Sequence, residues 1–216
     1  MSSTRRDEIL ARIRAALRHK QRSAEDEAEL ERRLRSAPRG PHPQLHDALL
    51  DQFVAKAEAN HFTVERVASL QMLVPAVQRL LAEAEAPPDI SVAGSLASLG
   101  WPQDWTINTG PARMVEAMSV TMAVAGVAET GSVILRSDAK NPTTLNFLPD
   151  THVIVLRASD VVAYLEDAWA QVPGESGDWP RTVNVISGPS RTADVGGVLV
   201  RPAHGPKAAH IVLVGE

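Results

Sequence analysis

The clearest indication of the fold is a strand-like segment that runs directly into a polar loop, Thr182-Val183-Asn184-Val185-Ile186 followed by Ser187-Gly188-Pro189-Ser190-Arg191-Thr192-Ala193-Asp194. The first five residues alternate and are rich in β-branched side chains, which is typical of a strand. The loop combines turn-forming residues, hydroxyls and opposite charges, a mixture that simple packing does not require. Ligands of open α/β sheets bind beyond the carboxyl ends of the strands, so this loop is a predicted ligand site.

Strands and helices alternate on either side of this segment. The residue pattern predicts helices near 45–59, 70–85 and 159–171, and strands near 61–66, 89–93, 131–136, 152–156, 182–186 and 210–214. Strands interleaved with helices favour a mostly parallel sheet that is covered by helices. The expected fold class is therefore α/β.

A different pattern occupies the first part of the chain. Residues 4–19 place apolar side chains at helical spacing, namely Ile9, Leu10, Ile13, Ala16 and Leu17. The following stretch to Arg39 is charged and ends in a segment rich in proline. We expect an N-terminal helical arm and linker over residues 1–43 and an α/β domain over 44–216. The arm is either a solvated tail or a docking helix for a partner or a second copy, since an amphipathic stripe favours burial.

The composition limits the class of protein. The chain has 216 residues, 44% of them hydrophobic, and no Cys. Without thiolates, this chain alone cannot ligate an iron–sulfur cluster or a thiolate zinc site. No apolar run approaches the roughly 18 residues of a membrane span. The Arg-rich start leads into Asp7 and Glu8 and not into the apolar core of a signal peptide. A soluble, cytoplasmic protein with no membrane span is expected.

Charge is distributed unevenly between the two regions. Residues 1–40 carry 11 Lys and Arg against 7 Asp and Glu, a net +4, whereas residues 41–216 carry 11 against 19, a net −8. A domain at −8 repels phosphates, and only 4% of the residues are aromatic, so platforms for stacking bases are scarce. Nucleic acid is therefore not an expected partner.

The loop after the predicted strand at 182–186 has the features of an anion site. Gly188 permits close backbone approach, Ser190 or Thr192 can cap a short helix, and Arg191 supplies a charged fork. The alternative is that Arg191 and Asp194, three residues apart, pair with each other and only stabilise the turn.

A second candidate ligand loop is Ala128-Glu129-Thr130-Gly131-Ser132, which precedes the predicted strand at 131–136. It offers a carboxylate, two hydroxyls and a glycine. The simpler interpretation is a turn in which Gly131 has a positive φ and Thr130 caps locally.

The third segment, His204-Gly205-Pro206-Lys207, is a predicted turn that is close in sequence to the first loop. Ser190, Asp194 and His204 do not form a convincing hydrolase triad, because no strand, G-x-S-x-G and helix elbow is present. No metal site is expected, since His204 and His210 lack the spacing of zinc ligands. A structural role for His204, or a hydrogen bond from it to an anion, is the better interpretation. Phosphate-binding glycine motifs of dinucleotide and NTP sites are also absent from the sequence.

Together these blocks resemble the LUD domain of the lactate utilization protein C family. The resemblance is carried, in order, by Ala128-Glu129-Thr130-Gly131-Ser132, Leu148-Pro149 before His152-Val153-Ile154-Val155, Ser187 to Asp194, and His204-Gly205-Pro206. It implies a three-layer α/β/α fold like that of ribose-5-phosphate isomerase, glucosamine-6-phosphate deaminase and CoA transferases. It also implies a role in oxidising L-lactate to pyruvate beside an iron–sulfur protein and an oxidoreductase subunit. The resemblance identifies neither a catalytic role nor a cofactor.

Two functions of different class follow. In the first, the chain is a non-redox component of an L-lactate utilization system and binds a small anionic ligand at the carboxyl ends of the strands. The ligand-binding residues expected for it are Thr130, Gly131, Ser187, Gly188, Ser190, Arg191, Thr192, Asp194, His204 and Gly205. In the second, the chain is a stand-alone enzyme that acts on a phosphorylated or CoA-linked metabolite, with Glu129 as the catalytic acid, base or acyl acceptor. A second copy of the chain is a further candidate partner.

Overall fold

The computed structural model describes residues 3–16, 23–36, 39–45, 48–113, 115–173, 177–192, 202 and 204–215. The chain forms two compact units, Met1–Pro41 and His42–Glu216. Asp194, which was predicted to belong to the ligand site, lies outside the described residues.

The first unit consists of two helices, α1 (Ser3–Ala16) and α2 (Ala24–Ser36). Ile9 and Ile13 of α1 and Leu30 and Leu34 of α2 are exposed. Both helices thus present apolar side chains to solvent. Within the described residues, no helix is long and apolar enough to cross a membrane.

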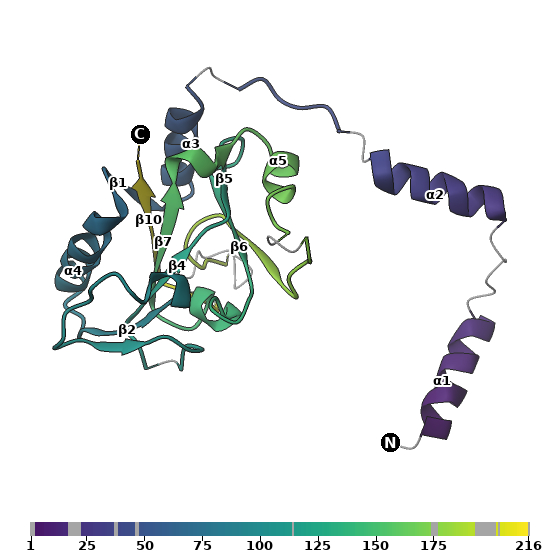
Figure 1. Cartoon of the computed structure of the whole chain (residues 1–216), viewed down its shortest axis with the longest axis horizontal. Coiled ribbons are helices and arrows are strands. Elements are labelled where there is room, and N and C mark those ends of the chain that lie inside the picture. Colours follow the sequence, from purple (N-terminus) through teal and green to yellow (C-terminus); the bar gives the residue numbers. More distant parts are fainter. Residues whose placement is uncertain are drawn as a thin grey trace. The chain divides into compact units, whose positions relative to one another are not determined.

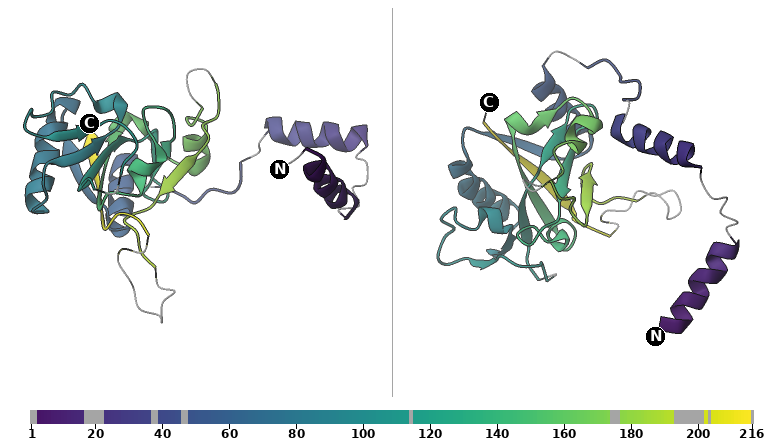
Figure 2. Two further views of the ribbon diagram at one scale, coloured as in Figure 1. Left: turned by 90° about the horizontal axis from the view of Figure 1, so that it is seen from below. Right: turned by 45° about the vertical axis from the view of Figure 1, so that its right-hand side comes forward.

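A six-stranded parallel sheet forms the centre of the second unit, in the order β1-β10-β7-β4-β2-β3. The strands are β1 (Thr63–Val67), β2 (Asp89–Val92), β3 (Thr106–Asn108), β4 (Met118–Met122), β7 (Thr151–Arg157) and β10 (Ala208–Val214). Although β10 is the last strand in the chain, it lies inside the sheet, between β1 and β7 (Figures 1 and 2). This confirms the mostly parallel sheet that the sequence predicts.

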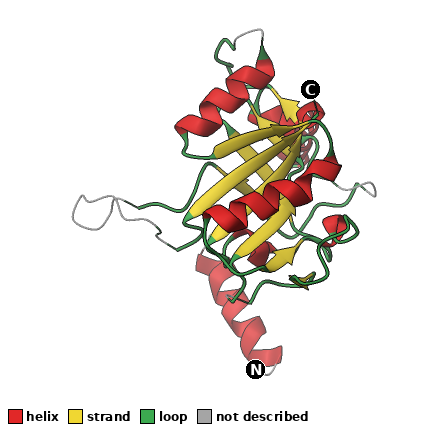
Figure 3. Ribbon diagram, turned by 90° about the vertical axis from the view of Figure 1, so that its left-hand side faces the viewer, coloured by secondary structure: helices red, strands yellow, loops and turns green. Residues whose placement is uncertain are grey.

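The two faces of this sheet have different covers. Residues of β7 alternate between them: Val153 and Val155 pack with α4 (Leu73–Glu83), whereas Ile154 and Leu156 pack with α3 (Leu49–Ala59). Figure 3 views the sheet from the side of α4 and shows a helix across that face. The short 3-10 turns η1 (Leu70–Met72), η2 (Gly94–Leu96), η3 (Thr143–Asn146) and η4 (Ala158–Asp160) connect the elements.

A smaller sheet shares the second face with α3. Its order is β8-β5-β6-β9, with strands β5 (Ala125–Val127), β6 (Ser132–Arg136), β8 (Val161–Val162) and β9 (Val183–Ile186). The β5/β6 and β6/β9 pairs are antiparallel. Val133 and Leu135 of β6 join the same apolar cluster as α3 and β7. Residues far apart in sequence thus form one layer.

Two sequence predictions need correction here. The strand predicted at 182–186 belongs to the smaller, mixed sheet and pairs antiparallel with β6, so its end is not part of the carboxyl edge of the parallel sheet. Val185 of this strand is 48% exposed, as expected of an edge strand with one solvated face and not of a strand covered on both sides. The helix predicted over 159–171 is reduced to α5 (Leu165–Trp169), because β8 occupies Val161–Val162 and pairs with β5.

The strands at 106–108, 118–122 and 125–127 were not predicted. Two of them have only three residues, too few to show an alternation. The predicted linker residues His42 and Pro43 contact the α/β unit: the His42 ring stacks on Tyr164 at 3.9 Å, and the Tyr164 hydroxyl donates to the Pro43 carbonyl at 2.9 Å.

Candidate functional site

A cavity of about 330 Å³ lies where the end of β9 meets the beginnings of β7 and β10. It is therefore at the amino edge of the parallel sheet, opposite to the edge that the sequence suggested. Its lining comes from the end of η3, from β7, from β9 and the loop after it, and from β10 and the loop before it. The lining residues are Asn146, Phe147, His152, Val185, Ile186, Ser187, Gly188, Pro189, Ser190, His204, Gly205, Pro206 and Ala209.

Hydrogen bonds join the two turns that the sequence singled out. The Ser190 amide donates to the Pro206 carbonyl at 2.9 Å, and the His204 amide donates to the Ser190 hydroxyl at 3.1 Å. The segments 187–190 and 204–206 thus form one wall of the cavity. Their proximity depends on the approach of β10 to the end of β9, which no local pattern reveals.

A row of three hydroxyls connects this wall to the turn between β5 and β6. The Thr130 hydroxyl donates to Ser132 at 2.8 Å, and Ser132 and Ser187 share a hydrogen bond of 2.6 Å. Ser132 is 3% exposed and lies between the other two. Sequence reasoning selected Thr130 and Ser187 as ligand-binding residues. It counted the Ser132 hydroxyl in the candidate loop but did not select it.

The end of α3 holds both loops in place. Asn60 follows α3, and its side-chain amide donates to the Thr130 carbonyl at 2.7 Å. Gly188 has a φ of +104°, and a Cβ there would lie 2.1 Å from the Asn60 carbonyl oxygen. Gly131 has a φ of +69°, and a Cβ there would lie 2.3 Å from the Ala57 amide nitrogen. Only glycine permits these two approaches of backbone to backbone.

A buried imidazole lies at the base of the cavity. His152 of β7 is 1% exposed, and its Nε2 is 2.8 Å from the Thr121 hydroxyl. Burial lowers the pKa of His152 to about 3, so the ring is neutral at physiological pH. His152 follows Thr151 and precedes the apolar run of β7, and the sequence analysis treated it only as the start of a strand.

Several predicted site residues lie elsewhere. Glu129 is in the β5–β6 turn, where its amide donates to the Ala163 carbonyl at 3.0 Å, and it does not line the cavity. Arg191 and Thr192 are described but are not among the lining residues. Their role in binding, and that of Asp194, stays a prediction.

The cavity has no charged side chain among its described lining residues when His is neutral. Its polar side chains are the hydroxyls of Ser187 and Ser190, the amide of Asn146 and the imidazoles of His152 and His204. Lys207, which follows the lining residue Pro206, is paired with Asp150 at 2.7 Å. Such a site favours a small ligand held by neutral hydrogen bonds over a highly charged one. In the described part of the chain, no group of three His, Cys, Asp or Glu residues is placed to hold a metal.

Comparisons with known proteins match the part of the chain that lines the cavity. Residues 116–214 match the LUD domain. The chain is 35% identical over 100 residues to the uncharacterized protein YkgG of Escherichia coli (strain K12), which covers 44% of this chain and 43% of that protein. It is 37% identical over 91 residues to lactate utilization protein C of Geobacillus thermodenitrificans, covering 40% and 38%. The matches therefore span less than half the length of these relatives.

A solved structure supports the fold. A DUF162 family protein from Deinococcus radiodurans superposes with a TM-score of 0.60 at 19% identity, covering 80% of this chain and all of the other. Every lining residue of the cavity lies between residues 116 and 214. This segment, and with it the whole lining of the cavity, is similar to the LUD domain.

Proposed function

We propose that this chain serves in L-lactate utilization as a non-redox component that works beside iron–sulfur and oxidoreductase proteins. The observation that carries the proposal is that the whole lining of the cavity falls within the LUD match, where relatives named lactate utilization protein C align. The chain has no Cys, which agrees with clusters held by other chains.

The ligand we assign to the cavity is a small hydroxycarboxylate, with L-lactate as the candidate. The hydroxyls of Ser187 and Ser190 supply donors for a carboxylate, and the lining adds apolar contacts through Ile186 and Ala209. A single carboxylate needs less compensation than a phosphate dianion, and this suits a site without cations. The sequence predicted a small anionic ligand, and the proposal here restricts it to an anion with a single negative charge.

His152 is proposed to orient the ligand and not to move protons. A general base works best when its pKa is near the working pH, whereas burial lowers the pKa of His152 to about 3. The hydrogen bond between Thr121 and Nε2 fixes the orientation of the neutral His152 ring, and the second ring nitrogen remains to form a hydrogen bond with the ligand.

Calorimetric titration of the full chain with L-lactate tests the binding step. We expect saturable binding that Ser187→Ala weakens about tenfold or more, the equivalent of one hydrogen bond to a charged carboxylate. Ser98→Ala, which removes an exposed hydroxyl outside the cavity, is the matched control. Equal affinities for the wild type and Ser187→Ala would contradict the assignment of the cavity.

The role in the cell needs a separate experiment. The full chain should restore growth on L-lactate to a bacterium that lacks its own lactate utilization protein C, and partners recovered with it should include an iron–sulfur protein. Turnover of a phosphorylated or CoA-linked substrate by the purified chain alone would instead favour a stand-alone enzyme.

A further inference from the structure

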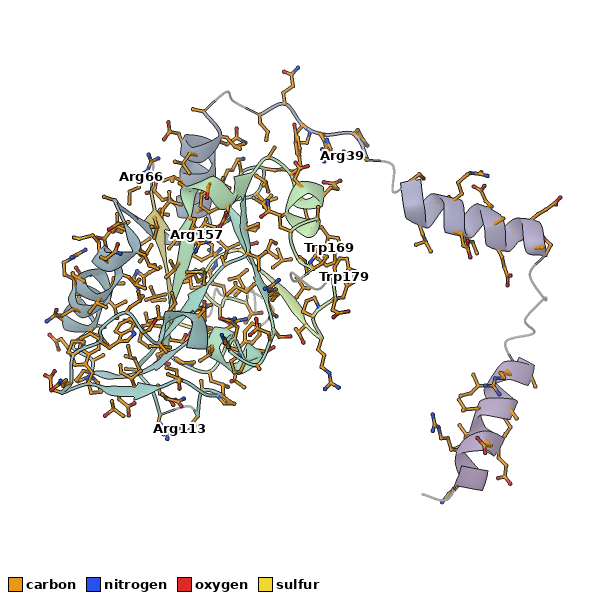
Figure 4. The ribbon with its side chains drawn as sticks, in the orientation of Figure 1. Arg39, Arg66, Arg113, Arg157, Trp169 and Trp179 are labelled. Atoms are coloured by element: carbon orange, nitrogen blue, oxygen red, sulfur yellow. The ribbon has the colours of Figure 1, made fainter. Side chains whose placement is uncertain are left out.

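A second cavity, of about 260 Å³, lies at the opposite edge of the parallel sheet. It is lined by residues that follow or end β2, β4, β6 and β7, among them Ser95, Met122, Arg136, Asn141, Arg157 and Asp160. His152 and Arg157 are five residues apart in β7, which separates the two cavities by about 16 Å of strand. Figure 4 labels Arg157 at the carboxyl end of β7.

The topology favours a ligand at this edge. β2 and β4 are neighbours in the main sheet. After β2 the chain continues to β3, at the edge of the same sheet, whereas after β4 it continues to β5, in the second sheet. The two connections thus run in different directions, and in open α/β sheets ligands bind in the crevice between such connections. Ser95 and Met122, which line the cavity, lie on these two diverging connections.

The charges in this cavity are incompletely matched. Among the described residues, no hydrogen bond or ion pair uses the Arg157 side chain. Within the part of the chain that the structure describes, the Arg136 side chain makes a 3.4 Å contact to the Val172 carbonyl and a 4.0 Å contact to Asp138. Asp160 accepts a hydrogen bond from the Ser159 hydroxyl at 3.2 Å. Two guanidinium groups therefore share the cavity with one carboxylate.

Asp138 does not neutralise the arginines effectively, because the adjacent turn uses its carboxylate. Its Oδ1 accepts from the amides of Lys140 at 2.7 Å and Asn141 at 2.9 Å, and the Asn141 side chain donates to both of its oxygens. These bonds also decide the orientation of the Asn141 amide, since a carboxylate can only accept. The Asn141 Oδ1 is then left buried, without a partner among the described residues.

We propose that this second cavity binds a small hydroxylated oxyanion, a phosphate ester or a carboxylate, separately from the ligand of the first cavity. Arg157 and Arg136 contact the oxyanion, because guanidinium groups bind such groups through paired hydrogen bonds. Asn141 Oδ1 accepts a hydrogen bond from a hydroxyl of the same ligand. The Arg157 guanidinium thus contacts the anionic group of the ligand, and Asn141 Oδ1 contacts its hydroxyl group.

Calorimetric titration at constant ionic strength tests this site, with sn-glycerol 3-phosphate and D-glycerate as probes. We expect saturable binding of at least one probe, weakened about tenfold or more by Arg157→Gln, the equivalent of one charge-assisted hydrogen bond. The tighter of the two probes identifies the oxyanion. Methyl phosphate, which has no hydroxyl group on its carbon, should bind more weakly than glycerol 3-phosphate.

Arg66→Gln is the matched control, since Arg66 is an exposed arginine of β1, outside the cavity and paired with Asp51. Ser187→Ala, in the first cavity, should also leave both probes unaffected, so this result is independent of the lactate assignment. Absence of saturable binding, or equal weakening by Arg157→Gln and Arg66→Gln, would overturn the proposal. Equal binding of methyl phosphate and glycerol 3-phosphate would overturn the role of Asn141.

Discussion

The two cavities at opposite ends of β7 differ in charge. The cavity at the amino edge offers hydroxyls and the imidazoles of His152 and His204, whereas the cavity at the carboxyl edge holds two arginines and a carboxylate. The same sheet supports both, but the first depends on turns brought close by α3 and β10, and the second on strand ends. Ligand charge should therefore select between them, and changes at one end should leave the other end intact.

The largest expected effect that separates the two ends is that of Gly188→Ala. Alanine at this position would have a positive φ, and its Cβ would lie 2.1 Å from the Asn60 carbonyl oxygen. We therefore expect the free energy of unfolding to decrease by about 4 kcal/mol. Binding of L-lactate should be lost, while that of the second-cavity probe should persist in the folded fraction.

Gly100→Ala is the control for this substitution, because Gly100 also has a positive φ, of +71°, but no atom within 4 Å of a new Cβ. Its cost should be limited to backbone strain. If chemical denaturation gives equal losses for both variants, the contact with Asn60 does not determine the position of the loop.

The next effect concerns pH. The pKa of His152 in the folded chain is about 3, below its ordinary value of 6.5, so the unfolded chain takes up a proton first as the pH falls. The stability present at neutral pH should decrease by roughly 2 kcal/mol between pH 6.5 and 4.5. Denaturant titrations across this range should show a weaker pH dependence for His152→Gln.

Two other groups affect the design of that measurement. Burial also lowers the pKa of His210, so His210→Gln must be measured in parallel. For Glu116, burial raises the pKa, but hydrogen bonds from the backbone and side chain of Arg113 outweigh it and hold the pKa at about 2. The stability that Glu116 contributes is lost only as the pH falls from about 4.5 toward 2.

A pH dependence that His152→Gln leaves unchanged above pH 4.5 would mean that His152 is not the buried neutral group we describe.

A smaller effect is expected from Ser132→Ala, which removes the central hydroxyl between Thr130 and Ser187. The loss should be about 1–2 kcal/mol in thermal or chemical unfolding. Ser119→Ala is a matched comparison, since the Ser119 hydroxyl is buried without a partner among the described residues. That variant should be neutral or slightly stabilising, and a similar loss in both would argue against the hydroxyl row.

The smallest effect on stability should come from deleting residues 1–40, which belong to a unit separate from His42–Glu216. We expect the α/β unit to unfold within about 0.5 kcal/mol of the full chain, while self-association or partner capture decreases. The apolar side chains of Ile9 and Ile13 favour burial in such a contact. Unchanged light scattering and unchanged partner capture would show that the arm is a solvated tail.

Part of the site was visible in the sequence because its chemistry is local. Gly188 and Gly131 were selected as turn glycines, and both have a positive φ in the structure. Asn60 and Thr121 were missed, and Ser132 was counted in its loop but not selected. Each of them acts through a hydrogen bond to a residue 31 or more positions away. The cavity at the carboxyl edge was missed for the same reason: its arginines end two different strands, in two different sheets.

The sequence by itself determined the α/β class, the mostly parallel sheet and the turns that carry glycine, since periodicity and backbone preference are properties of short segments. Only the tertiary structure decided that 183–186 pairs antiparallel with β6, that the first cavity faces the amino edge, and that His152 is neutral. The partner of a strand is determined by burial against α3 and the main sheet. The pKa of a side chain is determined by the groups that surround it. Both depend on contacts between distant residues, which a local pattern does not encode.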